Sequence, residues 1–220
     1  MTTTKLFWTD PYQTHCTATI TEINNTKVKL DQTIFYAFSG GQLSDEGTIG
    51  GIKVLEATKQ GDKEDIVDIE YTLEHVPSFK VGDTVNVQIN PVRREKLRRL
   101  HSAAHVVYYI VIELLGPIKI NGSEVQVEKA RMDFGYDTPI TDLLPKIEAA
   151  TNQFIQENHP IQRYVDPTKP DLWWWEIKEK NWKMPCGGTH VKNTSEIGPL
   201  KLVRVNKGKG RERIEMYLTN

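Results

Sequence analysis

The chain has 220 residues and a formal net charge of -1; hydrophobic residues make up 38% of it and charged residues 26%. This composition is typical of a globular protein and excludes disordered, collagen-like and coiled-coil chains. No apolar run approaches the roughly 20 residues that span a bilayer, and only two cysteines are present, which excludes a disulfide framework; we therefore expect a cytoplasmic protein with no secretory leader and no membrane contact.

Residues 1–90 are predicted to be rich in β-strands. Short runs of Val, Ile and Thr alternate there with Gly, Asn and Asp, which favour turns. The expected strands are 17–23, 26–30, 51–57, 66–73 and 84–89. Asn24 and Asn25 predict a hairpin turn between the first two. Strands this short and closely spaced suggest a small β-barrel or sandwich.

The character of the sequence changes at Pro91, where we place a domain boundary and the start of a helix. Proline suits the first helical position, and Gly116 with Pro117 ends the helix about 25 residues later. The apolar side chains that repeat at helical spacing, and should face a core, are Leu100, Ala104, Val107, Val111 and Leu114.

The remainder of the chain mixes strands with a second helix. Residues 124–134 predict a strand or hairpin, and residues 141–158 have helical periodicity. Further strands are expected at 161–165, 172–177, 200–205 and 213–218. Two long helices among antiparallel strands make residues 91–220 an α+β domain, so the predicted fold class of the whole chain is α+β.

Four histidine and cysteine side chains form the main candidate site. His101 and His105 lie at i and i+4, one above the other on the predicted helix. Cys186 and His190 enclose two glycines, which let the backbone turn so that thiolate and imidazole converge. These are ligand types that zinc prefers. Each pair alone is weak evidence, but together they use three of the six histidines, which indicates a shared site for one zinc ion.

A zinc peptidase is excluded by the residues between the two helical histidines. Such enzymes place a glutamate directly after the first histidine, where it acts as the general base. Ser102 occupies that position here, and no acid lies between His101 and His105.

Several segments, taken together, resemble one family. The segments His101-Ser-Ala-Ala-His105 and Cys186-Gly-Gly-Thr-His190 resemble the metal-binding motifs of the alanyl-tRNA synthetase editing domain and of its freestanding AlaX-type relatives. Further segments that resemble this family are 35–47, which is similar to its glycine-rich motif, 121–123, 131–134, 196–201 and 213–215. The resemblance covers nearly the whole chain.

The resemblance implies a fold and an activity. The fold is an N-terminal β-barrel, residues 1–90, followed by an α+β editing domain with one zinc ion, residues 91–220. The activity is hydrolysis of tRNA(Ala) charged with the wrong amino acid, chiefly serine and sometimes glycine, while Ala-tRNA(Ala) is spared. The chain resembles the medium-length freestanding type that acts in trans. Mischarged tRNA is the expected partner, and no obligate protein partner is inferred.

Selectivity for serine calls for groups that hydrogen-bond its hydroxyl, because aminoacyl esters are already labile. Ser123 and Thr189 are the candidates for this catalytic role; the alternative is ordinary turn or strand polarity. Zinc could be catalytic or substrate-binding if one of its ligands were displaced, and structural if all four remained bound.

The glycine-rich segment supplies candidates for substrate binding. Gly40, Gly41, Gln42 and Asp45 could approach the terminal adenosine or support the editing pocket, whereas the alternative is a tight turn. Asp133, in the segment that resembles the family's Arg-Phe-Asp-Phe, is a further substrate-binding candidate.

Positive charge is local in this slightly acidic chain. Two basic clusters are candidates for phosphate contacts, although such runs are usually solvated faces. The first comprises Arg93, Arg94, Lys96, Arg98 and Arg99, and the second Lys201, Arg204, Lys207, Lys209, Arg211 and Arg213. The run of tryptophans at 173–175 is assigned to core packing or a domain interface rather than to base stacking.

Two alternative functions stay open. The chain could be a zinc-stabilised tRNA-binding module without hydrolysis, or the same hydrolase could act on Ser-tRNA(Thr). The residues give no direct account of which acceptor stem is read.

Overall fold

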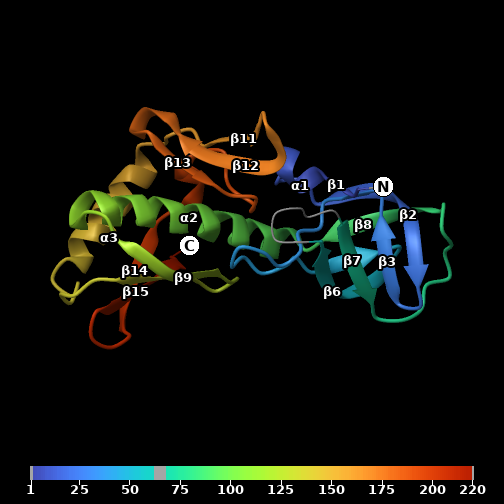
Figure 1. Cartoon of the computed structure of the whole chain (residues 1–220), viewed down its shortest axis with the longest axis horizontal. Helices are drawn as coiled ribbons and strands as arrows, with labels where there is room; N and C mark the ends of the chain where they lie inside the picture. The colour runs from blue at the N-terminus through green and yellow to red at the C-terminus, as the bar shows by residue number, and fades with distance from the viewer. Residues whose placement is uncertain (1, 62–67, 220) are drawn as a thin grey trace. The chain divides into compact units, whose positions relative to one another are not determined.

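The computed structural model describes residues 2–61 and 68–219 (Figure 1). Within them the chain forms two compact units. The first comprises residues 2–39, 43–61, 68–95 and 168–171, and the second comprises residues 40–42, 96–167 and 172–219. Among the described residues, the helices are too short or too polar to cross a membrane.

The first unit is built on a closed ring of six strands, in the order β2-β3-β7-β6-β5-β8. All six pairings are antiparallel. The strands are β2 (His15–Asn24), β3 (Lys27–Leu30), β5 (Gly47–Ile49), β6 (Ile52–Gln60), β7 (Asp68–Leu73) and β8 (Thr84–Ile89). Alternate residues of β8 are buried, as expected when one face of a strand packs on a core. This ring stands where the sequence predicts a small barrel.

The local signals in the first unit are mostly confirmed. Asn25 has a φ of 57°, the left-handed conformation that asparagine tolerates in a tight turn, and it joins β2 to β3 as predicted. Residues 66–67 of the strand expected at 66–73 lie outside the described residues. The sequence patterns did not indicate the short elements β1 (Thr4–Lys5), α1 (Leu6–Thr9), β4 (Gln32–Thr33) and β5.

The longest helix is α2 (Pro91–Leu115), and it has the bounds that Pro91 and Gly116 predict. Gly116 ends it with a φ of 83°, which glycine adopts without steric cost. Of the five predicted core positions, three are fully buried, whereas Ala104 and Leu114 are partly exposed. From residue 96 the helix belongs to the second unit.

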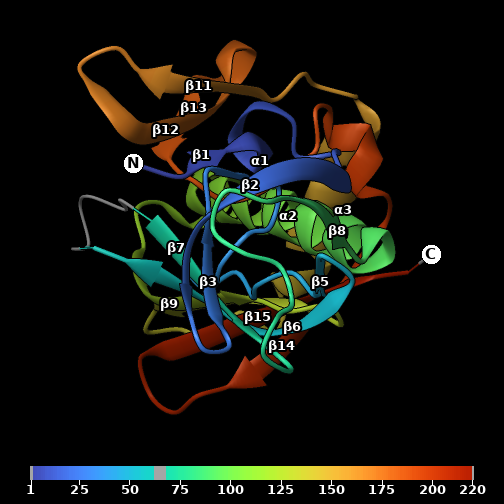
Figure 2. The same cartoon turned by 90° about the vertical axis from the view of Figure 1, so that its right-hand side faces the viewer.

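In the second unit, α2 passes between two antiparallel sheets (Figures 1 and 2). The four-stranded sheet has the order β14-β15-β10-β9, and the three-stranded sheet the order β11-β12-β13. Their strands are β9 (Lys119–Val125), β10 (Ala130–Gly135), β11 (Gln162–Asp166), β12 (Lys169–Ile177), β13 (Trp182–Pro185), β14 (Leu200–Asn206) and β15 (Arg211–Leu218). The α+β class is thereby confirmed.

The second helix, α3 (Leu144–Gln156), begins three residues later than the periodicity predicts. Residues 141–143 form a turn instead, and Pro145 lies at the start of the helix, where its missing N–H costs no hydrogen bond. Short 3-10 helices, η1 (Lys178–Lys180) and η2 (Thr194–Ile197), complete the unit.

Candidate metal site

The four predicted ligands converge within the second unit. One ligand atom from each of His101, His105, Cys186 and His190 lies within 4.8 Å of all the others. The Cys186 Sγ is 3.2 Å from the His190 Nε2 and 3.5 Å from the His101 Nε2. Helix α2 supplies two of the side chains, and the segment after β13 supplies the other two. Separate parts of the sequence thus build one group that could hold a metal ion.

His105 shows most directly that these residues fit a metal. Its ring stacks on Trp175 at 5.0 Å, and its Nε2 is buried without a hydrogen-bond partner among the described residues. A buried polar atom without a partner is costly unless another group satisfies it. An ion bound by the four side chains would do so, and imidazole and thiolate suit zinc.

A second layer of residues fixes the protonation of two of the histidine rings. The Oε1 of Gln42 accepts the backbone N–H of Thr189 at 3.0 Å, so it is an acceptor, and it lies 2.6 Å from the Nδ1 of His101. The proton of His101 is therefore on Nδ1, which leaves the Nε2 lone pair facing Cys186. Metal-bound histidines are usually held by a hydrogen bond of this kind.

Ser102 fixes the position of the proton on the ring of His190. Its hydroxyl donates to the carbonyl of Arg98 at 3.1 Å and accepts the backbone N–H of Val191 at 3.1 Å. With its proton used, the hydroxyl can only accept from the Nδ1 of His190, at 3.3 Å. The position where a peptidase has its general base thus holds a residue that orients a candidate ligand.

The protonation states of the rings also suit metal binding. Burial lowers the pKa of His105 to about 3, and burial likewise lowers the pKa of His101 and of His190 well below the ordinary value. The rings are therefore neutral at physiological pH, which is the form that binds a metal.

Two glycines are required by close contacts. A Cβ on Gly188 would lie 2.1 Å from the Cε1 of His101, so only glycine leaves room for that ring. The sequence predicts that Gly187 and Gly188 let the backbone turn, but Gly188 has no positive φ, so its role is to leave room for the His101 ring. Gly41, with a φ of 84°, would place a Cβ 2.6 Å from the carbonyl oxygen of Ser123.

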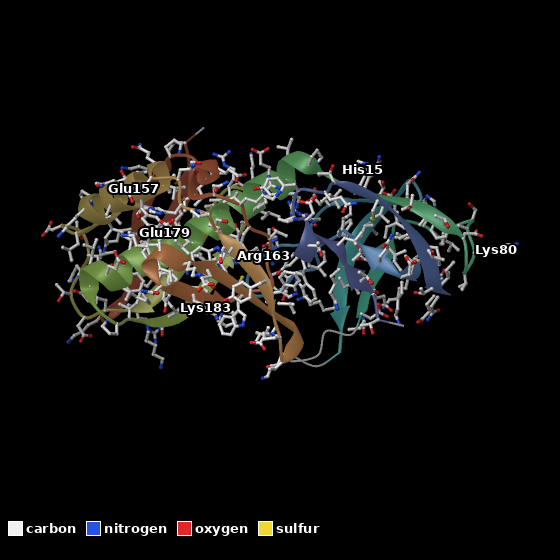
Figure 3. The ribbon with its side chains drawn as sticks, turned by 90° about the horizontal axis from the view of Figure 1, so that it is seen from above. His15, Lys80, Glu157, Arg163, Glu179 and Lys183 are labelled. Carbon is white, nitrogen blue, oxygen red and sulfur yellow. The ribbon has the colours of Figure 1, made fainter. Side chains whose placement is uncertain are left out.

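A cavity of about 300 Å³ opens beside His101 and His105. Its walls are mainly apolar and aromatic and come from α2, β9, β10 and β13, with Gly40 also lining it. Ser123 and Lys183 add a hydroxyl and a cation. Lys183, labelled in Figure 3, projects from the three-stranded sheet, and its ammonium lies 4.4 Å from the centre of the Trp174 ring. A largely apolar cavity with a few polar groups is typical of a small-ligand site.

The other predicted site residues take different places. Thr189 is fully buried, and its hydroxyl accepts from the Nε2 of Gln42 at 3.0 Å. Asp133 is bound by Arg131 and Arg213 and lines a separate cavity. Asp45 belongs to the first unit, where its carboxylate accepts from Arg94 and from the backbone N–H of Tyr36. The structure thus brings Ser123 and Gly40 to the candidate metal cavity and places Asp133 elsewhere.

The expected phosphate contacts at the start of α2 need correction. Arg94 is fully buried and ion-paired with Asp45, and Arg98 is buried as well. A guanidinium in these positions is inaccessible to a phosphate, so the prediction is wrong for both residues. Charge runs read from sequence alone do not distinguish a buried arginine from a solvated one.

Comparison with known proteins agrees with this site. Residues 177–215 match the family described as "Threonyl and Alanyl tRNA synthetase second additional domain", and residues 4–93 match "tRNA synthetases class II (A)". The chain is 34% identical to the alanyl-tRNA editing protein AlaX-M of Pyrococcus horikoshii, over 98% of both chains. The chain belongs to the AlaX family of alanyl-tRNA editing proteins.

The AlaX chain is also similar to part of larger enzymes. It is 32% identical to the alanine–tRNA ligase of Metallosphaera sedula over 93% of its own length, and 32% identical to that of Methanococcus maripaludis over 96%. In both cases it spans 25% of the ligase.

Proposed function

We propose that this AlaX chain is a zinc-dependent hydrolase that acts in trans on mischarged tRNA(Ala) in the cytoplasm and so maintains translation fidelity. Its substrates are chiefly Ser-tRNA(Ala), with Gly-tRNA(Ala) as a second, and it spares Ala-tRNA(Ala). The name of the P. horikoshii relative supports editing of alanyl-tRNA. The observation that carries the proposal is the cavity that places a hydroxyl, Ser123, beside the histidines of the candidate metal group.

The residues in and around the cavity are proposed to have different roles. When bound, zinc supplies a Lewis acid, able to orient water or the amino group of the substrate once a coordination position is open. Ser123 accepts a hydrogen bond from the seryl hydroxyl or donates one to it. An alanyl ester lacks this hydroxyl. Thr189, whose hydroxyl is engaged by Gln42, acts by holding that amide in place.

Gln42 and Gly41 support the site from the glycine-rich segment. Gln42 fixes the ring of His101, and the carbonyl of Gly41 accepts the backbone N–H of Val125 at 2.8 Å. We propose that the segment holds the editing pocket in shape, with Gly40 as its contact to substrate. The chain as a whole is proposed to work as an N-terminal β-barrel domain, residues 1–90, and an editing domain, residues 91–220.

Deacylation of Ser-tRNA(Ala) and of Ser-tRNA(Thr) by the zinc-loaded protein tests the proposal. We expect fast hydrolysis of the first and slow hydrolysis of the second. Cys186→Ala should bind less zinc and lose activity in proportion. Hydrolysis of neither ester, with tRNA still bound, would replace the hydrolase by a binding module, and preference for Ser-tRNA(Thr) would change the acceptor.

A further inference from the structure

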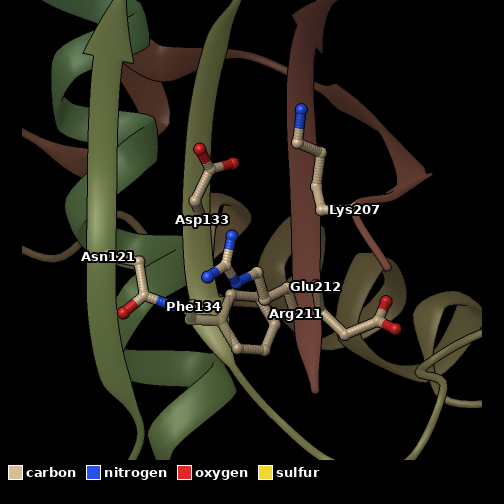
Figure 4. A pocket seen from close by; sticks show the side chains of 6 residues that line it. All are labelled: Asn121, Asp133, Phe134, Lys207, Arg211 and Glu212. Carbon is tan, nitrogen blue, oxygen red and sulfur yellow. The ribbon is translucent and has the colours of Figure 1, made fainter. Parts of the chain in front are cut away.

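A second cavity, of about 370 Å³, lies on the four-stranded sheet of the second unit (Figure 4). Asn121 of β9, Asp133 and Phe134 of β10, Lys207, and Arg211 and Glu212 of β15 line it. It shares no lining residue with the cavity at the metal group. Asp133 follows Met132, which lines the first cavity, so their side chains project to opposite faces of the sheet.

The two carboxylates of this cavity already have cationic partners. Asp133 accepts from Arg213 at 2.8 Å and from Arg131 at 2.6 Å. Glu212 is bound by both Nε and Nη2 of Arg204, at 2.5 and 2.6 Å. The hydrogen bond from Arg213 lowers the pKa of Asp133, so this carboxylate stays ionised and paired. The charge of Lys207 also lowers the pKa of Asp133, but less than the two arginines do.

Lys207 and Arg211 have no carboxylate within ion-pair distance in the described part of the chain. Both are exposed. Figure 4 shows the Arg211 side chain reaching from β15 across Phe134 toward Asn121, with the Lys207 side chain standing alongside β15. The cavity therefore combines two cations that form no close ion pair with an amide, a donor set that suits a phosphate group.

We propose that this cavity binds a backbone phosphate of tRNA, through Lys207 and Arg211, while the aminoacyl end occupies the cavity at the metal group. The proposal rests on the proposed function, because it takes tRNA as the partner. Asn121 and Ser123, one from each cavity, are two residues apart on β9, roughly 7 Å along the strand. Because β9 is the outer strand of its sheet, a nucleic acid that passes this edge can contact both cavities.

The structure also divides the second basic cluster of the sequence. Lys201 is paired with Glu148, Arg204 with Glu212 and Arg213 with Asp133. The cations without such a partner are Lys207, Lys209 and Arg211, which lie in or directly after the turn between β14 and β15. This division supplies a matched control, since Lys201 carries the same charge on the same sheet.

Binding of uncharged tRNA(Ala) to the double variant Lys207→Ala/Arg211→Ala, at several salt concentrations, tests the proposal. We expect about a tenfold weaker affinity and a fall of roughly 0.7 to 0.9 in the slope of log K against log salt, because the contact with one phosphate is lost. Lys201→Ala should leave both within twofold of wild type, and Lys207→Gln alone, in an exposed turn, should show about half of the slope change.

Two further measurements separate the outcomes. A seryl ester of adenosine, which has no backbone phosphate, should be hydrolysed equally by wild type and double variant; loss of that activity would show damage to the metal cavity and overturn the assignment. Unchanged tRNA affinity and salt slope in the double variant would also overturn it. If the double variant lost binding of inorganic phosphate but kept its tRNA affinity, the cavity would bind phosphate without contacting tRNA, which would overturn the proposal too. If wild type hydrolyses no ester yet tRNA binding depends on Lys207 and Arg211, the proposed function fails and the phosphate site stands.

Discussion

At the scale of single residues, Gln42 illustrates how much of the site depends on side chains that would never touch the metal. It is fully buried, and its amide joins the ring of His101 to both the backbone and the hydroxyl of Thr189. Gln42→Leu should weaken zinc binding roughly 10- to 100-fold, because His101 loses the partner that fixes its ring. Competition with a chelator measures the zinc affinity. Gln156→Ala, at an exposed position of α3, is the control, and equal zinc affinities for the two variants would contradict a positioning role.

A substitution at Gly188 tests directly whether His101 binds the metal. Alanine there would push a methyl group into the His101 ring, so Gly188→Ala should abolish stoichiometric zinc binding and lower the free energy of unfolding by about 1–3 kcal/mol. Gly135→Ala, whose Cβ would meet nothing closer than 3.9 Å, should leave the metal content unchanged. Metal analysis of both purified variants decides the point; a full zinc complement in Gly188→Ala would show that His101 is not a ligand.

Ser123 tests the source of selectivity. Ser123→Ala should lower kcat/KM for Ser-tRNA(Ala) about tenfold, the value of one hydrogen bond, and should leave hydrolysis of Gly-tRNA(Ala) nearly unchanged. Kinetics on both esters measure the difference. If the two rates fell together, Ser123 would act on the ester itself or on the shape of the cavity rather than on the seryl hydroxyl.

At the scale of elements, local signals predicted α2 but not the contacts that complete the site. Pro91 and Gly116 fix the ends of this helix through backbone chemistry of their own. By contrast, β13 has four residues and ends in proline, so it forms only because β12 pairs with it. The contact of Gln42 with His101 joins residues 59 positions apart and belongs to no periodic pattern. Residue types therefore indicated the candidate ligands, whereas the residues that support them required the three-dimensional structure.

The end of α3 carries a pH-dependent element. Burial lowers the pKa of His159, but hydrogen bonds to Glu157 and Glu179 outweigh it and raise the pKa above the ordinary value (the two glutamates are labelled in Figure 3). The folded state therefore binds this proton more tightly than the unfolded state. The resulting stability is fully present below about pH 6.5, the unfolded pKa, and is lost as the pH rises through the folded pKa.

His159→Gln removes this contribution. We expect the difference in Tm between wild type and variant to be larger at pH 5.5 than at pH 9, a sign that follows from the raised pKa. Thermal unfolding at both values measures it, with His75→Gln, at an exposed position of the first unit, as the control. A larger difference at the higher pH would contradict the ion pairs.

At the scale of the whole molecule, the compact units do not follow one cut through the sequence. Residues 40–42 belong to the second unit although the segments before and after them belong to the first. A change in composition, such as that at Pro91, shows where helices replace strands. It does not show that residues 40–42 pack with the second unit. The sequence could therefore predict the two kinds of structure, and the resemblance could predict the family, but neither could assign Gln42 to the metal group.

The net charge of the whole chain was also a poor guide to its charged surfaces. A value of -1 conceals pairs such as Arg204 with Glu212, and leaves Lys207 and Arg211 as local, unpaired cations. Which cations are free depends on partners across the sheet, and these follow from strand register rather than from spacing in the sequence.

We propose that this AlaX chain removes serine from tRNA(Ala) and spares alanine at the cavity beside the candidate metal group. The most direct test is to measure, with zinc-loaded protein, the deacylation rates of Ser-, Gly- and Ala-tRNA(Ala) side by side. We expect rapid loss of serine, slower loss of glycine and an alanyl ester that decays only at its uncatalysed rate. Equal hydrolysis of the seryl and alanyl esters, or hydrolysis of neither, would contradict it.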